Sequence, residues 1–109
     1  MEKIRDIKKI KEEILKSVND MGIRIKNIIL FGSRAKGIFK TDSDWDFLII
    51  LEKNVSREEK IEIAHIIRKK LAELYVPCDV LIKSEEEVEA RKNIIGSVIK
   101  SAMKEGIPL

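Results

Sequence analysis

Two aspartates one residue apart, Asp44 and Asp46, begin an apolar stretch that reads DWDFLIIL. Side chains alternate across a strand, so both carboxylates should project from one face, about 6 to 7 Å apart along the backbone. Like charges at this spacing repel unless a cation, a proton or a metal ion compensates them. Asp79 precedes VLI in a similar setting. Three carboxylates at the starts of two adjacent strands predict an oxygen-rich site suited to Mg²⁺ or Mn²⁺.

A glycine-containing turn precedes the aspartate pair. The segment ILFGSRAKG occupies residues 29–37, and Gly32 ends its apolar part. Such a turn can open a short helix whose free N–H groups suit a phosphate, to which the Ser33 hydroxyl can also donate. Arg34 and Lys36 add mobile positive charge. A phosphate cradle beside a carboxylate cluster is typical of phosphoryl or nucleotidyl transfer.

Each of these features also has a purely structural interpretation. A Gly-Ser turn after a strand is often only a turn, and an Asp-x-Asp pair at a strand edge can be solvated charge. Gly32 and Gly37 match the outer glycines of a P-loop, but Ile38 and Phe39 replace the Lys and Ser/Thr that a P-loop requires. The two features in this order along the chain favour a functional site.

The surrounding pattern predicts the helices and strands that position these residues. Helical spacing of apolar residues predicts an opening helix from about Ile4 to Val18, a short helix follows at 33–37, and capping-box patterns at Ser56 and Ser84 begin two more. The predicted buried stripes are Ile61, Ala64, Ile67, Leu71 and Leu74 in the third helix, and Val88, Ile95, Val98, Ile99 and Ala102 in the last.

Apolar, β-branched segments at 23–31, 45–51 and 78–82 are predicted strands. The element order predicts an α/β or α+β domain, with a small central mixed sheet of three or more strands flanked by helices. With three clear strands the sheet is minimal, so we expect a short extra strand or another chain to complete one edge.

The composition indicates one domain over residues 1–109, with 44% apolar residues available for a core. A net charge of +3 does not indicate direct nucleic-acid binding. No apolar signal segment or 18-residue apolar run is present, so we expect a cytoplasmic protein without membrane contact. Cys78 is the single cysteine and is predicted to be a small buried residue. Abundant Lys and Glu without glutamine resemble the composition of thermophile proteins.

Taken together, FGSRAKGIFKTDSDWDFLIILE resembles the signature of the DNA polymerase β nucleotidyltransferase superfamily, G-S-x-x-x-G followed by D-x-D at the next strand. The short chain is similar to the minimal nucleotidyltransferases of prokaryotes. The resemblance implies the nucleotidyltransferase fold, with Gly32 and Ser33 binding the nucleotide phosphates and Asp44 and Asp46 holding two Mg²⁺ ions. Asp79 would be the third carboxylate, which helps to position and activate the attacking hydroxyl.

The resemblance also implies a partner and a reaction. Minimal members of the superfamily are similar to the antitoxin halves of two-gene modules whose partner is a HEPN-type ribonuclease. The implied reaction is transfer of AMP from ATP, or of another nucleoside monophosphate, to a tyrosine of that toxin. Two alternatives stay open: a noncatalytic partner-binding module with a vestigial nucleotide site, and a nucleotidyltransferase acting on a small molecule. The chain could also form a homo-oligomer.

Overall fold

The computed structural model describes residues 7–32, 35 and 44–109. Its strands are β1 (Ile25–Phe31), β2 (Trp45–Leu51), β3 (Cys78–Ser84) and β4 (Ile107–Pro108). Its helices are α1 (Ile7–Asn19), α3 (Arg57–Glu73), α4 (Glu85–Arg91) and α5 (Val98–Glu105). Of the predicted short helix at 33–37 only residue 35 is described, and the predicted start of the opening helix at Ile4 lies outside the described residues.

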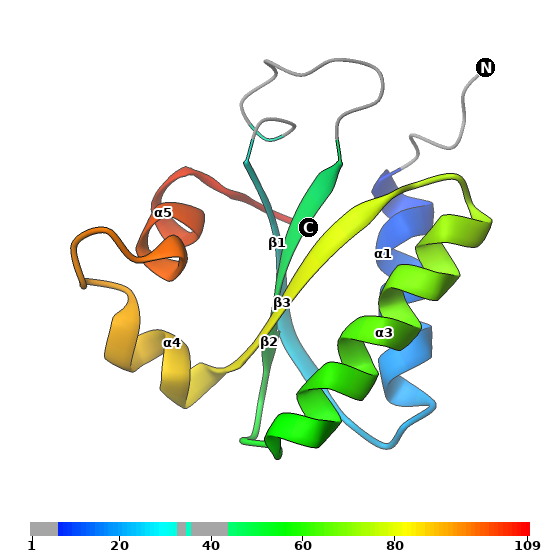
Figure 1. Ribbon diagram of the computed structural model, residues 1–109, viewed down its shortest axis with the longest axis horizontal. Helices are drawn as coiled ribbons and strands as arrows, with labels where there is room; N and C mark the ends of the chain where they lie inside the picture. The colour runs from blue at the N-terminus through cyan, green and yellow to red at the C-terminus, as the bar shows by residue number, and fades with distance from the viewer. Residues whose placement is uncertain (1–6, 33–34, 36–43) are drawn as a thin grey trace.

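The strands form one mixed sheet in the order β3-β2-β1-β4. β1 is antiparallel to both β2 and β4, whereas β2 and β3 are parallel. A parallel pair needs a crossover connection, and α3 supplies it (Figure 1). The predicted extra edge strand is β4 of the same chain, and next to it the Leu109 N–H donates to the Ile28 carbonyl at 2.8 Å.

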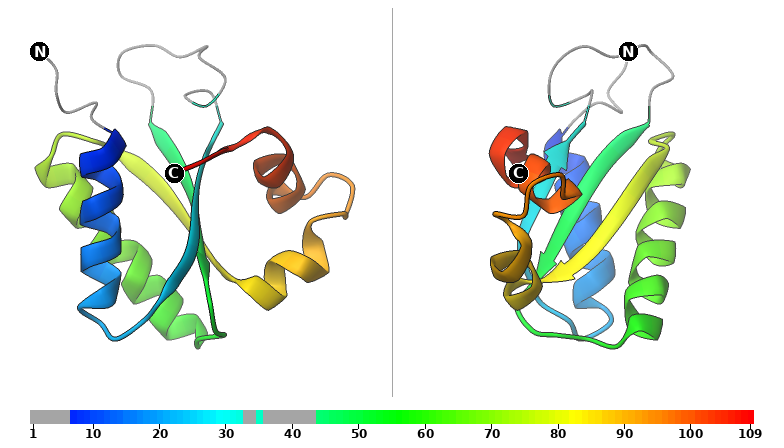
Figure 2. Two further views of the ribbon diagram at one scale, coloured as in Figure 1. Left: turned by 180° about the vertical axis from the view of Figure 1, so that it is seen from behind. Right: turned by 60° about the vertical axis from the view of Figure 1, so that its left-hand side comes forward.

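The helices cover both faces of the sheet. Figures 1 and 2 show α1 and α3 on one face and α4 and α5 on the other. The larger core cluster lies under α1 and α3, and a smaller one under α4 and α5 consists of Ile29, Leu48, Ile50, Val88, Ile99 and Ala102. The central strand β2 is buried on both sides from Phe47 to Leu51, as its continuous apolar sequence predicts. Among the described residues no helix has the length and apolar character needed to cross a membrane.

Residues that flank the aspartates pack in the core under α1 and α3. Trp45, between Asp44 and Asp46, is buried and stacks on Phe47 with ring centroids 6.1 Å apart. Cys78, just before Asp79, is also buried, which confirms its predicted role as a small core residue. Because side chains alternate along a strand, Asp46 and Asp79 project from the opposite face of the sheet, away from α1 and α3.

The third helix begins as predicted, but one residue of its predicted stripe is wrong. The Ser56 hydroxyl accepts from the Glu59 N–H at 3.1 Å, and the Glu59 carboxylate accepts from the Ser56 N–H at 3.0 Å, which is a complete capping box. Ile61 is 60% exposed, because Ile63 defines the buried face instead. Two residues correspond to about 200° around a helix, so Ile61 and Ile63 cannot share a face.

The predicted last helix is two helices. α4 ends at Arg91, Gly96 has a φ of +84°, and Ser97 caps α5 by accepting from the Lys100 N–H at 2.9 Å. The break shifts the helical phase. Val88, Ile99 and Ala102 are buried as predicted, whereas Ile95 is 88% exposed and Val98 is 56% exposed. The apolar pattern across the break indicated one continuous stripe, and a left-handed glycine followed by a capping serine interrupts it.

Candidate active site

Asp46 and Asp79 lie next to each other at one end of the sheet. They are register partners in the parallel β2–β3 pair, so they occupy adjacent strands at the same level. Neighbouring strands are about 4.8 Å apart, and register partners project from the same face. Further along β2, at Leu48 and Ile50, the same face of the sheet is covered by α4 and α5. Asp44 lies two residues before Asp46, directly ahead of β2, and is exposed.

Asp46 is affected by the negative charge of both other aspartates. The pKa of the Asp46 carboxyl is raised above its ordinary value, first by burial, then by the negative charge of Asp79 and then by that of Asp44. Burial and like charges both disfavour the ionised form. A cation or a proton in this region would relieve the repulsion. The strand register brings Asp46 and Asp79 together, while a common site of all three aspartates and their roles stay a prediction.

Gly32 lies against the Asp46 carboxylate. It follows Phe31, the register partner of Asp46 in β1, and it has a φ of +78°. A Cβ atom at position 32 would overlap the Asp46 Oδ2 atom, so a side chain at this position would displace the carboxylate. Glycine is required here both by its left-handed backbone and by the close approach of Asp46. The other predicted phosphate-binding residues, Ser33, Arg34 and Lys36, lie outside the described residues.

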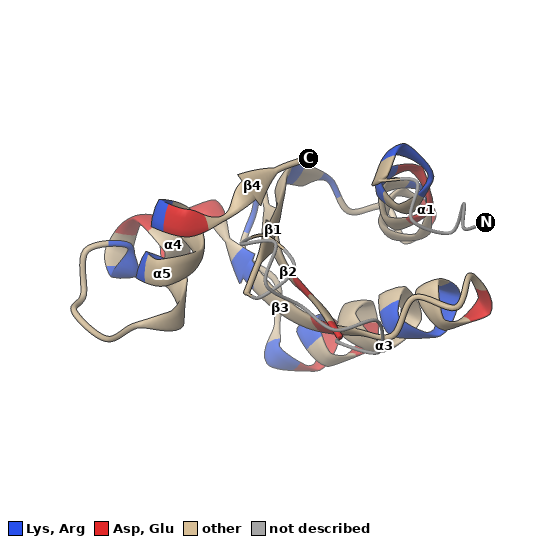
Figure 3. Ribbon diagram, turned by 90° about the horizontal axis from the view of Figure 1, so that it is seen from above, with Lys and Arg blue, Asp and Glu red and all other residues tan. Residues whose placement is uncertain are grey.

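Figure 3 looks onto this end of the molecule. Acidic residues stand at the starts of β2 and β3, while basic residues are distributed over α1, α3, α4 and α5. On α3 the basic residues alternate with acidic ones, as expected for a solvated helix face. At the starts of β2 and β3 the charged residues that the structure describes are therefore the acidic ones.

The donor set fits a hard divalent cation that arrives with a phosphate ligand. In the described part of the chain, no three His, Cys, Asp or Glu side chains are close enough together to hold a metal ion. Mg²⁺ is usually bound by one or two carboxylates, with waters and substrate phosphates completing its coordination. Asp46 and Asp79 supply two adjacent carboxylates, and Asp44 precedes Asp46 by two residues. The residues suit an ion shared with a nucleotide more than a preformed protein cage.

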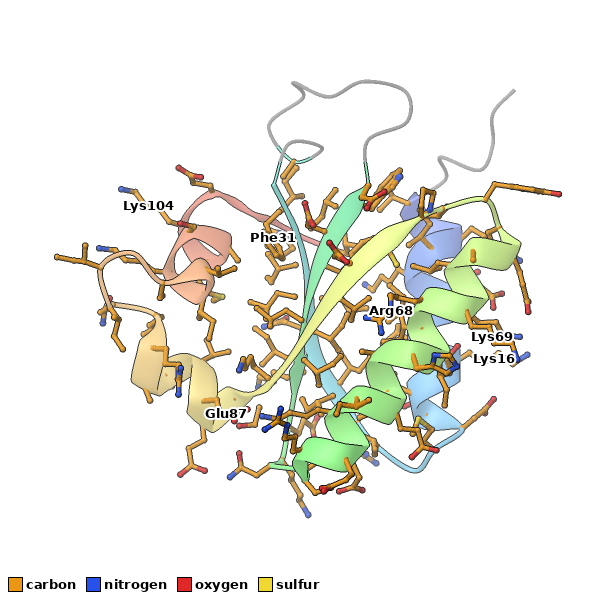
Figure 4. All side chains as sticks on the ribbon, viewed as in Figure 1. Lys16, Phe31, Arg68, Lys69, Glu87 and Lys104 are labelled. Atoms are coloured by element: carbon orange, nitrogen blue, oxygen red, sulfur yellow. The ribbon has the colours of Figure 1, made fainter. Side chains whose placement is uncertain are left out.

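Sequence reasoning missed an apolar hollow beside the carboxylates. A depression of about 360 Å³ is lined by Phe31, Asp46, Asp79, Val80, Leu81 and Val98. Figure 4 shows Phe31 near the end of β1, on the side of the sheet toward α5. Strand alternation could have placed Leu81 on the face of Asp79, but nothing in the sequence brings Val98 to this position. Its presence there depends on how α5 docks.

Two other hollows lie at the opposite end of the sheet. Both are lined by Gly22, Ile23, Arg24 and Glu52, and their volumes are about 360 and 570 Å³. Arg24 precedes β1 and Glu52 follows β2, whereas the aspartates lie where β1 ends and β2 begins. None of the predicted site residues lines these hollows.

Residues 7–108 match the family model of the nucleotidyltransferase domain, and the chain belongs to this family. The mixed four-stranded sheet with helices on both faces is the fold of that class. No match is found among curated proteins.

Solved structures of toxin–antitoxin complexes share the fold. One contains AMP-PNP (TM-score 0.59, 19% identity, 90% of this chain and 70% of that chain). A second is a MntA–HpeT complex with a tyrosine-to-alanine substitution (TM-score 0.58, 20% identity, 91% and 70%). A third is a tri-AMPylated HEPN toxin from Shewanella oneidensis with its MNT antitoxin (TM-score 0.56, 16% identity, 93% and 69%). At these identities the likeness shows the fold alone.

Proposed function

We propose that this chain is a metal-dependent nucleotidyltransferase that transfers AMP from ATP to a tyrosine hydroxyl of a HEPN-type toxin, and so acts as an antitoxin. The observation that carries the proposal is the juxtaposition of Asp46 and Asp79 in register on one sheet face, with Asp44 close by and Gly32 against Asp46. Family membership supports the reaction class. The toxin–antitoxin complexes of the same fold, one with AMP-PNP and one with an AMPylated HEPN toxin, support the nucleotide and the partner.

The reaction is a displacement at the α-phosphorus of ATP. The acceptor oxygen forms a bond to the α-phosphorus, the bond from that phosphorus to the oxygen bridging the β-phosphate breaks, and pyrophosphate leaves. The acceptor proton moves to a carboxylate. Asp79 suits this role, because it is exposed at the start of an edge strand while Asp46 is partly covered.

The carboxylates also explain why the site should bind a cation. The repulsion that raises the pKa of Asp46 is a cost that a bound divalent ion would remove. Asp44, Asp46 and Asp79 would hold Mg²⁺ or Mn²⁺ only together with the nucleotide phosphates, and the bound ion would lower the pKa of an attacking hydroxyl and offset charge on the leaving pyrophosphate. Gly32 keeps the end of β1 close to this charge, and Ser33, which follows it in the sequence, is the proposed phosphate-binding hydroxyl.

The proposal is tested by incubating the purified chain with labelled ATP, Mg²⁺ and its HEPN-type partner. We expect label on the partner, an added mass of whole AMP units, and loss of about 10²-fold or more in rate for Asp46→Asn or Asp79→Asn. Asp20→Asn is the matched control, because Asp20 is an exposed aspartate just after α1, away from the site. Transfer at the wild-type rate by either site variant would refute the carboxylate roles.

The same variants separate catalysis from simple partner binding. If Asp46→Asn loses transfer and also fails to protect cells from the toxin, neutralisation depends on modification. If the chain transfers no AMP and the Asp46→Asn variant still protects, the chain is a noncatalytic binding module and the proposed reaction is wrong. A co-purification assay records complex formation in both cases.

A further inference from the structure

The carboxylates Asp46 and Asp79 are part of the lining of the apolar hollow described above. Phe31, Asp46 and Asp79 lie at one level across β1, β2 and β3, since Asp46 is the register partner of both other residues. Leu81 lies two residues after Asp79 and therefore on the same face. Phe31 and Leu81 both pack against the cluster under α4 and α5, and Val98 closes the hollow from α5. One small cavity thus has an acidic end and apolar walls.

The walls of this hollow are left partly uncovered by α5. Ile29 and Leu48, one level further from the carboxylates, are buried, whereas Phe31 and Leu81 are only partly buried and Val98 is 56% exposed. Apolar surface that stays in contact with water beside a set of carboxylates is available to a ligand. A ligand placed here would bury these side chains and would at the same time reach Asp46 and Asp79.

The chemistry of the hollow favours a neutral ring that carries a hydroxyl. Without a bound metal ion, ionised carboxylates accept hydrogen bonds and repel phosphates, so the acidic end suits a hydroxyl donor. The apolar walls suit an aromatic ring. The adenine ring of ATP is a competing occupant. Adenine is separated from the reacting α-phosphorus by the ribose, whereas the ring of a phenolic acceptor carries the attacking oxygen itself and must lie immediately beside the carboxylates.

We infer that Phe31, Leu81 and Val98 form the pocket for the aromatic ring of the acceptor, with the acceptor hydroxyl directed to Asp79 and Asp46. This inference rests on the proposed function and deepens it, because it identifies the residues that select tyrosine over aliphatic hydroxyl acceptors. The pocket excludes the charged side chains of neighbouring acceptor residues and orients the phenolic oxygen.

The test uses p-cresol, the side chain of tyrosine as a free molecule, without ATP or metal. Amide chemical shifts of the isotope-labelled protein are followed during titration with p-cresol. We expect shifts that saturate and that centre on Phe31, Leu81 and Val98. Because this measurement needs no transfer, its result is independent of whether the chain proves to be an active nucleotidyltransferase.

A pair of variants makes the test specific. Val98→Glu places a charge at the pocket wall, at the first residue of α5, where the helix dipole stabilises a carboxylate and the substitution is therefore compatible with the helix. Ile95→Glu adds the same charge to an exposed apolar residue that does not line the hollow. We expect Val98→Glu to weaken p-cresol binding about tenfold or more and Ile95→Glu to leave it unchanged.

Three results would overturn the inference: no saturable shifts near Phe31, equal weakening by the two variants, or displacement of p-cresol by AMP from the same residues. The last result would assign the hollow to the nucleotide base. Failure of the proposed function is recorded separately, as the absence of AMP transfer by the wild-type chain, and it leaves the p-cresol titration unaltered.

Discussion

The repulsion between Asp46 and Asp79 predicts that Asp46→Asn stabilises the fold while it removes activity. The two residues are register partners on adjacent strands, which places their charges about 5 Å apart. Coulomb's law then gives about 0.8 kcal/mol at the dielectric constant of water and about 3 kcal/mol at an effective value near 20. Asp79 is exposed and Asp46 is only partly buried, so solvent and salt screening favour the lower end. We therefore expect a gain of about 1 kcal/mol.

The pH dependence of this gain follows from the raised pKa of Asp46. Between its unfolded and folded pKa values, the folded protein binds a proton at this site more tightly than the unfolded chain does. Wild-type stability from this group is therefore fully present below the unfolded value of 3.8 and is lost as the pH rises through the folded value. Burial alone would raise the pKa of the Glu87 carboxyl, but hydrogen bonds from Lys60 and Ser84 outweigh burial, so this pKa is lowered. The contribution of Glu87 to stability therefore has the opposite pH dependence. It is the same in the wild type and in the Asp46→Asn variant, so it cancels when the two are compared.

Urea unfolding with a chelator present, followed by circular dichroism, measures the difference. At pH 7 we expect Asp46→Asn to be more stable by about 1 kcal/mol, or roughly 4 °C in Tm, and the gap should close toward pH 4. Asp44→Asn should give a smaller gain, because Asp44 perturbs Asp46 less than Asp79 does. A variant that is less stable than the wild type, or a gap that does not depend on pH, would refute the reasoning.

Two further predictions concern neighbours of the site. Gly32→Ala should cost about 1 to 3 kcal/mol more in urea unfolding than Gly22→Ala, since both glycines have φ near +78° but only position 32 would bring a Cβ atom against Asp46; equal losses would exclude the contact. Cys78 should resist a thiol reagent at pH 8 until the protein is unfolded, because burial raises its thiol pKa to about 12; rapid labelling of the folded protein would contradict its placement in the core.

Local sequence accounts for much of the fold. The capping boxes at Ser56 and Ser84 depend on side chains three residues apart, so sequence alone locates both helix starts. The continuous apolar run of β2 predicts a strand buried on both faces, which the structure confirms. The errors, at Ile61 and in the break between α4 and α5, arise where an apolar residue is compatible with more than one helical phase. Packing against the sheet then selects the phase.

The candidate site divides in the same way. The amino-acid sequence by itself determined which groups are available: Asp44 and Asp46 two residues apart at the start of a strand, Asp79 at the start of another, and a glycine before them. Only the tertiary structure decided that Asp79 pairs in register with Asp46, that Gly32 contacts the Asp46 carboxylate, and that Val98 borders them. Side-chain alternation is a local property of the backbone, whereas strand register and helix docking are set by long-range packing that short-range sequence patterns do not encode.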